Sequence, residues 1–318
     1  MKILWRNGTK TEDVTRYVES VDWEGSDTQT SRTATISTAF CHERNICLGM
    51  KLGDVVSLNE NGDIFIGVVT YAERNGDVGT VSYTAKDFMH YFIRSKGSYN
   101  FKNTTPENVT KKICGDLLVL TTDVYKTKTH VKSLLFESEL YYSMIVTAYN
   151  EASRKMSAKC PPVFMPIMKG SRLSVIVKGK SSGITLDGEK DIISSAYSQS
   201  TDEMVTRVVI LNKNGKKSGV LEHAKNLKKY GVYQDVYKKE EDKNAKDAAR
   251  QLLYGITREA SVESLGHIQC VAGYSVKIKD KASGLTGTFY IESDRHTWKD
   301  GIHTMELTLK FSNELEEA

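Results

Sequence analysis

The residues best suited to chemistry lie near the end of the chain, in the stretch GTFYIESDRHTWKDGIHTMELTLKF from Gly287 to Phe311. It contains His296 and His303, with Asp294 close by, and such side chains can bind a metal ion or transfer protons. The same stretch alternates apolar and polar residues on both sides of an Asp-Gly pair, which is typical of a β-hairpin. Whether the histidines form a site depends on how the two strands pair.

The alternation predicts the register of this hairpin. Directly paired residues point to the same face of a sheet, so apolar residues should pair with apolar ones. A two-residue turn at Asp300-Gly301 would pair Ile291 with Lys310, an apolar residue with a polar one. A three-residue loop from Lys299 to Gly301 would instead pair Ile291 with Leu309. We therefore predict the three-residue loop, with its glycine left-handed in a bulge.

That register separates the two histidines. It pairs Phe289 with Phe311 and places His296 across from Thr304 on the polar face of the ribbon. His303 then belongs with the apolar row, as a residue near the tip with a satisfied hydrogen bond. Because the two imidazoles would point to opposite sides, they should not converge on one ion. We interpret the stretch as a structural hairpin, and we predict no metal ligand, cofactor-binding residue or catalytic residue there.

Cysteine usage gives no second metal candidate. The five cysteines include no Cys-x-x-Cys pair, so a disulfide framework or a zinc ribbon is not expected and a reducing compartment is favoured. The densest group is CHERNIC, from Cys41 to Cys47, with His42 inside it. Its spacing matches no common zinc pattern, and we interpret it as an ordinary strand-to-loop segment.

Acidic residues offer an alternative, enzymatic interpretation. Glu137 and Glu139, or the run Glu240, Glu241 and Asp242, could act as the paired carboxylates of a glycosidase. Acids at the start of a helix, however, more often complement the helix dipole. The chain contains no Gly-x-Ser-x-Gly elbow, His-Glu-x-x-His helix, phosphate loop or dinucleotide fingerprint. We therefore do not expect an enzyme.

One basic segment could bind single-stranded nucleic acid. KNLKKYG, from Lys225 to Gly231, precedes Lys238-Lys239, with tyrosines interleaved at 230, 233 and 237. Acids between Asp235 and Asp242 dilute this charge, and the net charge of +4 is too small to indicate nucleic acid. We do not expect specific nucleic-acid recognition, and we interpret Ser181-Ser182-Gly183 as a loop.

Composition and patterning describe the elements that must position these residues. The 318 residues, 39% apolar and 26% charged, suit two domains, or one large domain with an insertion. The first residues, MKILWRNG, are too weakly apolar for a signal peptide, and no run approaches the ~18 apolar residues that span a bilayer. We expect synthesis in the cytosol and no membrane segment.

Turn signals predict an α+β, β-rich fold. Asn-Gly pairs at 61 and 75 separate three expected strands in a meander, after an earlier strand from Thr33 to Phe40. Thr105 and Pro106 should start a helix. A second helix is expected from about Glu139 to Met156, capped by Ser138, and a third near residues 242–255, closed by Gly255.

Two stretches carry a family resemblance. They are IFIGVVTYAERNGDVGTVSYTAKD, from Ile64 to Asp87, and GYSVKIKDKASGLTGTFYIESDRHTWKDGIHTMELTLKF, from Gly273 to Phe311. With these cadences of strands and turns, the chain resembles the baseplate hub proteins of contractile phage tails. The likeness is to the form found in prophage-like elements and in phage-tail-like bacteriocins (tailocins) of Gram-positive bacteria.

The resemblance implies two tail-tube-like antiparallel β-barrel domains, expected at residues 1–97 and 171–318, with a small helical insertion at 98–170. It implies a homotrimeric ring that adapts the sixfold tail tube to the threefold spike. The implied partners are the tail tube protein, the central spike protein, and other baseplate and LysM-like tail proteins. The chain would be made in the bacterial cytoplasm and assembled into the tail.

Two other functions remain open at this point. One is a tail cell-wall hydrolase that uses carboxylates or the region of His296 and His303. The other is an oligonucleotide-binding β-barrel that uses the segment from Lys225 to Lys239.

Overall fold

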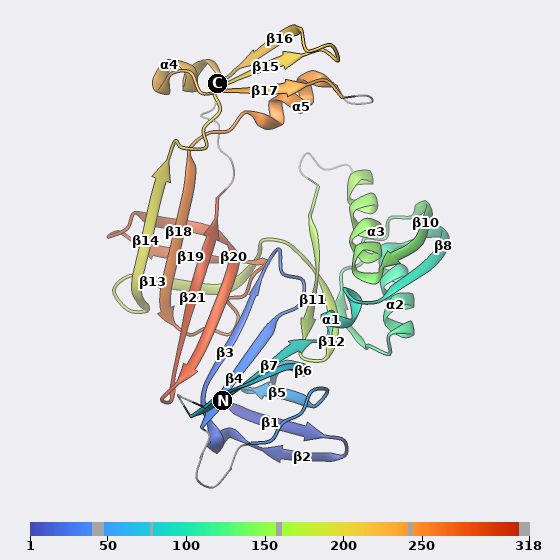
Figure 1. Cartoon of the computed structure of the whole chain (residues 1–318), viewed down its shortest axis with the longest axis vertical. Coiled ribbons are helices and arrows are strands. Elements are labelled where there is room, and N and C mark those ends of the chain that lie inside the picture. The colour runs from blue at the N-terminus through green and yellow to red at the C-terminus, as the bar shows by residue number, and fades with distance from the viewer. Residues whose placement is uncertain (40–47, 77–78, 157–160, 241–243, 312–318) are drawn as a thin grey trace.

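The computed structural model describes residues 1–39, 48–76, 79–156, 161–240 and 244–311. Strands dominate this part of the chain (Figure 1), so the expected α+β, β-rich class is confirmed. The segment from Cys41 to Cys47 lies outside the described residues. None of the helices in the described ranges is long and apolar enough to cross a bilayer.

Strands from both ends of the chain form one large sheet, with 13 strands among the described residues. They are β1 (Lys2–Asn7), β2 (Lys10–Asp13), β3 (Val18–Ser26), β4 (Thr33–Ala39), β5 (Val55–Asn59), β6 (Asp63–Asn75), β7 (Thr80–Asp87), β13 (Lys180–Asp187), β14 (Ile192–Ser200), β18 (Thr257–Leu265), β19 (Tyr274–Asp280), β20 (Leu285–Lys299) and β21 (Ile302–Lys310). A short 3-10 helix, η1 (Thr15–Tyr17), precedes β3.

The sheet runs through two halves. Its path is β14–β18–β21–β20–β3–β4–β7–β6–β5–β1–β2, with β19 paired to β20 and β13 paired to β19. We call residues 1–87 the first half, and residues 178–200 and 257–311 the second half. The expected meander is confirmed, since β5, β6 and β7 pair antiparallel in order. Each half has its own buried cluster, around Ile36 and Val56 in the first and Ile278 and Leu307 in the second.

One strand joins the halves. β20 pairs through Tyr290 with β19, and from Ser293 to Lys299 the same strand pairs antiparallel with β3. The strand therefore leaves one neighbour and takes up the other at Glu292, whose carbonyl accepts a hydrogen bond of 2.8 Å from the Asp27 N–H. The domain boundaries expected from the sequence (1–97, 98–170 and 171–318) stay a prediction.

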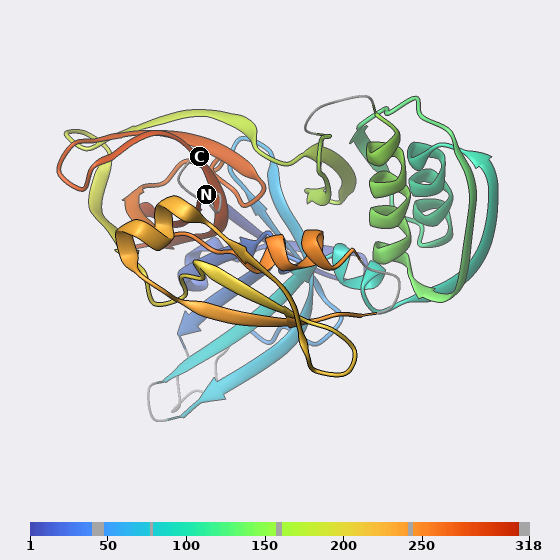
Figure 2. The ribbon, with the colours of Figure 1, turned by 90° about the horizontal axis from the view of Figure 1, so that it is seen from above.

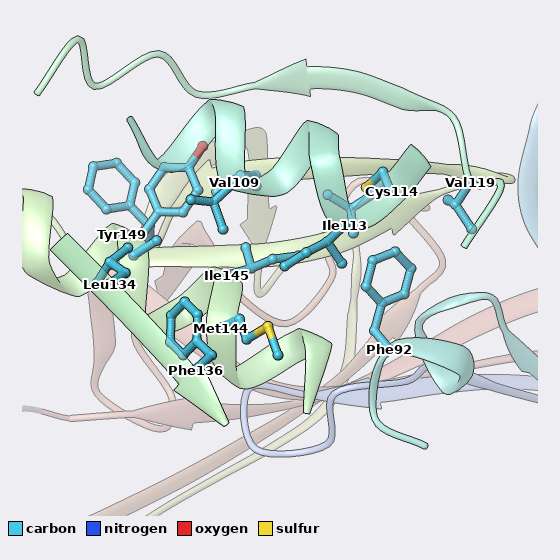
Figure 3. Packing of buried hydrophobic residues seen from close by; sticks show 14 of the residues in the cluster. Phe92, Val109, Ile113, Cys114, Val119, Leu134, Phe136, Met144, Ile145 and Tyr149 are labelled. Atoms are coloured by element: carbon cyan, nitrogen blue, oxygen red, sulfur yellow. The ribbon is translucent and has the colours of Figure 1, made fainter. Parts of the chain in front are cut away.

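Residues 88–177, which we call the insertion, lie beside the sheet (Figures 1 and 2). They form α1 (Met89–Phe92), β8 (Lys96–Thr104), α2 (Pro106–Asp116), β9 (Thr121–Val124), β10 (Val131–Leu140), α3 (Tyr141–Lys155), β11 (Phe164–Lys169) and β12 (Arg172–Val177). The two longer helices pack together with Val109 and Ile113 of α2 against Ile145 and Tyr149 of α3 (Figure 3). This core explains the apolar spacing of both helices.

The insertion helices confirm one predicted start and correct another. Thr105 is the N-cap of α2 and Pro106 its first residue, as expected. The next helix, expected from about Glu139 to Met156, is present as α3 from Tyr141 to Lys155, but its predicted cap at Ser138 is wrong because the N-cap is Leu140. β10 continues to Leu140 by pairing with β8, and Ser138 is a left-handed residue (φ 52°) inside this pair. Ser138 therefore lies in a strand and does not cap the helix.

Residues 201–256 form a small lobe at one end of the molecule (Figure 1). It consists of β15 (Arg207–Leu211), β16 (Lys217–Glu222), α4 (Ala224–Tyr230), β17 (Gln234–Lys238) and α5 (Ala245–Leu252). α5 starts at its N-cap, Asn244, and ends at Leu252, so the expected closure at Gly255 is wrong. Leu253 is already extended and buried, and Tyr254 bonds to Val205 as an isolated bridge.

Candidate functional site

The terminal hairpin has a two-residue turn, so the predicted three-residue loop is wrong. Asp300 (φ 52°) and Gly301 (φ 78°) are both left-handed, and Lys299 pairs directly with Ile302. The register shifts farther along, between Ile291 and Ser293 of β20. This bulge restores the predicted pairing of Ile291 with Leu309 by another route. Between the turn and the bulge, polar residues therefore pair with apolar ones, as Lys299 does with Ile302. Apolar residues pair with each other only beyond the bulge, as Ile291 does with Leu309.

The histidines consequently lie on one face, so the prediction that they point to opposite sides is wrong. His296 pairs with Met305, not with Thr304, and Trp298 pairs with His303. The Nδ1 atom of His296 lies 3.1 Å from Nε2 of His303, and the ring of Trp298 stacks on His303 at 4.0 Å between centroids. Two histidines seven residues apart therefore form one hydrogen-bonded pair.

The proton positions of this pair follow from their neighbours. His296 Nε2 lies 3.1 Å from the carbonyl oxygen of Cys270, which can only accept. Nε2 of His296 therefore carries the proton, and its Nδ1 accepts from the Nε2–H of His303. Burial lowers the pKa of His296 to about 4, and burial also lowers the pKa of His303. The pair is consequently neutral at pH 7.

A buried ion pair lies next to the histidines. Asp294 Oδ1 accepts from Nη1 of Arg32 at 2.9 Å and from the Ala272 N–H at 2.6 Å, and Nη2 of Arg32 donates to Oδ2 of Asp294. The guanidinium carbon of Arg32 also lies 4.1 Å from the ring centroid of Trp23. Arg32 precedes β4 and Asp294 belongs to β20, so this ion pair connects the two halves.

The Arg32–Asp294–His296 cluster, as we call these three residues, is almost entirely buried. The side chains of Asp294 and His296 have no exposed surface, and that of Arg32 is 14% exposed. In this conformation the carboxylate and the imidazole cannot meet a substrate, and their hydrogen bonds go to groups of the protein. The arrangement suits a polar lock between sheet halves. Within the described ranges, no three His, Cys, Asp or Glu side chains are grouped to hold a metal ion.

The two sets of carboxylates considered for a glycosidase lie on different parts of the chain. Glu137 and Glu139 are exposed residues of β10 in the insertion, and the Glu139 carboxylate accepts from the N–H of Leu140. Glu240 follows β17 in the small lobe, while Glu241 and Asp242 lie outside the described residues. The first pair and Glu240 therefore belong to separate parts of the molecule (Figure 1).

The basic segment forms a short helix, and of the three interleaved tyrosines only Tyr230 belongs to it. Residues 224–230 are α4, and the ammonium group of Lys229 lies over the ring of Tyr230, 4.9 Å from its centroid. Tyr237 packs against the buried cluster beneath α5, whereas Tyr233 is 39% exposed. Base stacking on a row of tyrosines needs several rings on one exposed face. The described conformation does not provide that row.

Sequence reasoning missed Arg32, which completes the cluster, and Trp23, on which Arg32 stacks. Arg32 stands 262 positions before Asp294, and no local pattern marks it as the partner of a buried carboxylate. Asp294 itself was visible as an acid beside a histidine. Its role depends on the pairing of β3 with β20, which brings the two ends of the chain together.

Comparison with known proteins agrees with this fold. The uncharacterized protein YqbQ of Bacillus subtilis (strain 168) is 23% identical over 96% of each chain. The phage-like element PBSX protein XkdQ of the same organism is 23% identical over 97% of each chain. Among solved structures, the 43 kDa tail protein of prophage MuSo2 from Shewanella oneidensis superposes with a TM-score of 0.70 at 12% identity and covers 97% of each chain.

The expected resemblance to phage baseplate-type proteins is confirmed at the level of family and fold. The profile of the YQBQ-like family matches residues 21–310, which include the insertion, the small lobe and both halves of the sheet apart from β1, β2 and the start of β3. The chain therefore belongs to the YQBQ-like family.

Proposed function

We propose that this chain is a structural hub of the baseplate of a contractile phage tail or tailocin. Three copies form a ring between the sixfold tail tube and the threefold spike. The observation that carries the proposal is the pairing of β3 with β20, which fixes two β-sheet halves side by side in one chain. Three chains then supply six halves while the assembly keeps threefold symmetry.

The junction is suited to carry load between the halves. Seven consecutive residue pairs, from Ser293 with Ser26 to Lys299 with Ser20, connect β20 to β3. The buried pair of Arg32 and Asp294 adds a second connection beneath these backbone bonds. A ring built from such chains would keep each pair of halves in fixed orientation, as a symmetry adaptor requires.

Strand edges supply the surfaces for ring formation. β14 and β2 end the sheet path, and each pairs with a single strand among the described residues. Exposed edges readily pair with strands of other chains, and closure into a ring removes the hazard of open-ended association. Ile193 on β14 is 55% exposed at such an edge. The tail tube and spike proteins, with other baseplate and LysM-like proteins, are the proposed neighbours above and below the ring.

This function is a structural one and needs no reacting group. It is supported by the relatives, which include a phage-like element protein and a prophage tail protein. In the same proposal the chain is assembled into the tail after synthesis in the bacterial cytoplasm. Turnover of purified peptidoglycan by the wild-type chain would contradict the proposal and would favour the cell-wall hydrolase.

Mass measurement tests the ring. Light scattering should give three times the 35.6-kDa chain mass, alone or together with candidate tube and spike proteins. Ile193→Lys should reduce this association, because a lysine on an edge strand opposes pairing with another strand. Ile302→Lys is the matched control, since Ile302 is 58% exposed at the tip of the terminal hairpin. A wild-type chain that stays monomeric with both partners would refute the hub.

A further inference from the structure

A cavity of 380 Å³ lies where the two halves meet the insertion. Its walls come from β3 and β6 of the first half, from β11 of the insertion, and from β13 and the 268–274 segment of the second half. Sites for small ligands occupy about 300–1,000 Å³ and often lie between structural units. Neither the proposed ring nor the Arg32–Asp294–His296 cluster gives this cavity a role.

One side of the cavity is apolar. Met165 and Ile167 of β11 face it together with Ile64 of β6 and Val271 from the segment before β19. Met165 is 7% exposed, so its surface is almost wholly withdrawn from bulk water. Such a wall favours a hydrocarbon group, because burial of apolar surface gains roughly 25 cal/mol per Å².

Another side of the cavity carries hydrogen-bond donors. Lys180 and Ser181, at the start of β13, line it. The Ser181 Oγ accepts from the Gly183 N–H at 3.1 Å, so its hydroxyl proton remains available to donate. Among the described residues no hydrogen bond or ion pair within 4.0 Å holds the Lys180 ammonium group, and the nearby carboxylate on which its charge acts, Asp123, is bound by Lys169 at 2.9 Å. The prediction that Ser181-Ser182-Gly183 is a loop is therefore wrong, because these residues belong to β13, whose first two residues, Lys180 and Ser181, are two available donors.

Two buried donors without partners add to this side. Trp23 and Arg32 both line the cavity, and neither Nε1 of Trp23 nor Nε of Arg32 has an acceptor within the described residues. Trp23 is 5% exposed, so water does not replace the missing acceptor freely. Buried N–H groups of native proteins almost always have a partner, and two exceptions around one cavity point to an absent acceptor.

The acidic residues of the lining do not balance these donors. Asp87 accepts from the Ser31 hydroxyl and from the backbone N–H groups of Arg32 and Met89. Asp63 accepts from the side-chain amide of Asn59. Both oxygens of Asp87 and one oxygen of Asp63 are therefore engaged by protein groups, and Asp63 is exposed to solvent, whereas several donors of the lining are not engaged. The chemistry left open in the cavity is that of an acceptor with an apolar body.

We propose that this cavity binds an apolar carboxylate, with its hydrocarbon part against β11 and its carboxylate toward Lys180, Ser181 and Trp23. The ligand can be a free medium-chain carboxylate or the carboxyl terminus of an apolar peptide, since both present the same chemistry. This inference is independent of the proposed ring, because all walls of the cavity belong to one chain.

Calorimetric titration of the full chain with octanoate tests the site, with 1-octanol and octylamine as uncharged and cationic probes. We expect saturable 1:1 binding of octanoate, and binding roughly tenfold weaker for 1-octanol, because a charge-assisted hydrogen bond is lost. N-acetyl-leucyl-leucine and its C-terminal amide distinguish the source. Tighter binding of the free acid dipeptide than of octanoate indicates a chain terminus, and the reverse indicates a small carboxylate.

Three substitutions locate the binding. Lys180→Glu should weaken octanoate binding at least tenfold, and Trp23→Phe, which removes the indole N–H donor together with part of the ring that stacks on Arg32, about fivefold. Lys190→Glu is the matched control, because Lys190 is an exposed lysine between β13 and β14 that does not line the cavity. Unchanged melting temperatures show that the variants remain folded. Equal binding of octanoate, 1-octanol and octylamine, unchanged affinity in Lys180→Glu, or no saturable binding would overturn the site.

Discussion

Replacement of Arg32 by alanine tests how much the buried ion pair of the junction contributes to the free energy of unfolding. In the wild-type chain, Arg32 holds both oxygens of Asp294, whose side chain has no exposed surface. Loss of one partner from a buried ion pair costs about 3–5 kcal/mol, because the other charge stays buried without compensation. The stacking of the guanidinium on Trp23 is lost as well. We expect the free energy of unfolding of Arg32→Ala to fall by about 3–5 kcal/mol.

Arg295→Ala provides a matched control on the same pair of strands. Arg295 of β20 binds Asp22 of β3 at 3.1 Å, but their side chains are 54% and 22% exposed. Asp22 also keeps the hydroxyl of Thr297 as a donor at 2.6 Å after the substitution. Exposed ion pairs contribute about 0–1 kcal/mol, so Arg295→Ala should change the free energy of unfolding by no more than that.

Urea unfolding of both variants, followed by far-UV circular dichroism and by tryptophan fluorescence, measures the two losses under the same conditions. The difference between the variants is the informative quantity, since both remove one arginine between the halves. Losses that agree within about 1 kcal/mol would refute the assignment of Arg32 and Asp294 as the lock of the junction.

Two further predictions concern a strained residue and a buried base. Leu118 is 91% exposed and has a left-handed backbone (φ 55°), which is strained for any residue with a Cβ atom. Leu118→Gly should therefore raise the free energy of unfolding, measured by urea unfolding, by about 1 kcal/mol. A loss of stability would contradict this backbone strain. The pKa of His296 is about 4 in the folded chain, below the ~6.5 of an unfolded histidine, so its stability contribution is complete above pH 6.5 and declines toward pH 4. His296→Gln should therefore lose less stability than the wild type, by about 3 kcal/mol, between pH 7 and 4 in urea titrations, and equal losses would contradict the low pKa.

Local signals predicted the elements whose causes are local. The Asn61-Gly62 turn and the Thr105-Pro106 helix start both depend on the conformational preferences of adjacent residues, and both are present. The β-rich class follows from many such turns. The cap of α3 differs from the prediction because Ser138 has a helix-capping side chain, while the pairing of β10 with β8, some 40 residues away, keeps it in a strand and makes Leu140 the N-cap. Partners distant in sequence overrode the local preference.

Only part of the candidate site can be predicted from the sequence, again because some of its contacts join residues that are distant along the chain. Asp294, His296 and His303 share a stretch of ten residues and could be seen as a group. Arg32 could not, since its contact depends on a strand pair between opposite ends of the chain. The cavity walls likewise come from three separate regions, so no sequence pattern marks them.

The error about the histidines has a single physical origin, the bulge at Glu292. Apolar matching required a shift of one residue somewhere between the turn and Ile291, and a three-residue loop would have placed that shift at the turn. Asp300 and Gly301 both accept left-handed conformations, however, so the two-residue turn fits there without strain. The shift moved to the point where β20 changes its neighbour from β19 to β3.

A bulge costs little at that point, because the ladder on the other edge of β20 is already interrupted. The Asp27 N–H occupies the Glu292 carbonyl, so the irregular residue keeps a hydrogen bond. Residues 293–299 of β20 therefore point to the opposite face from the predicted one. This brings His296 and Trp298 to the same side of the hairpin as His303. The same irregularity that lets β20 pair with both halves therefore also brings together His296, which is buried, and His303, which is partly buried.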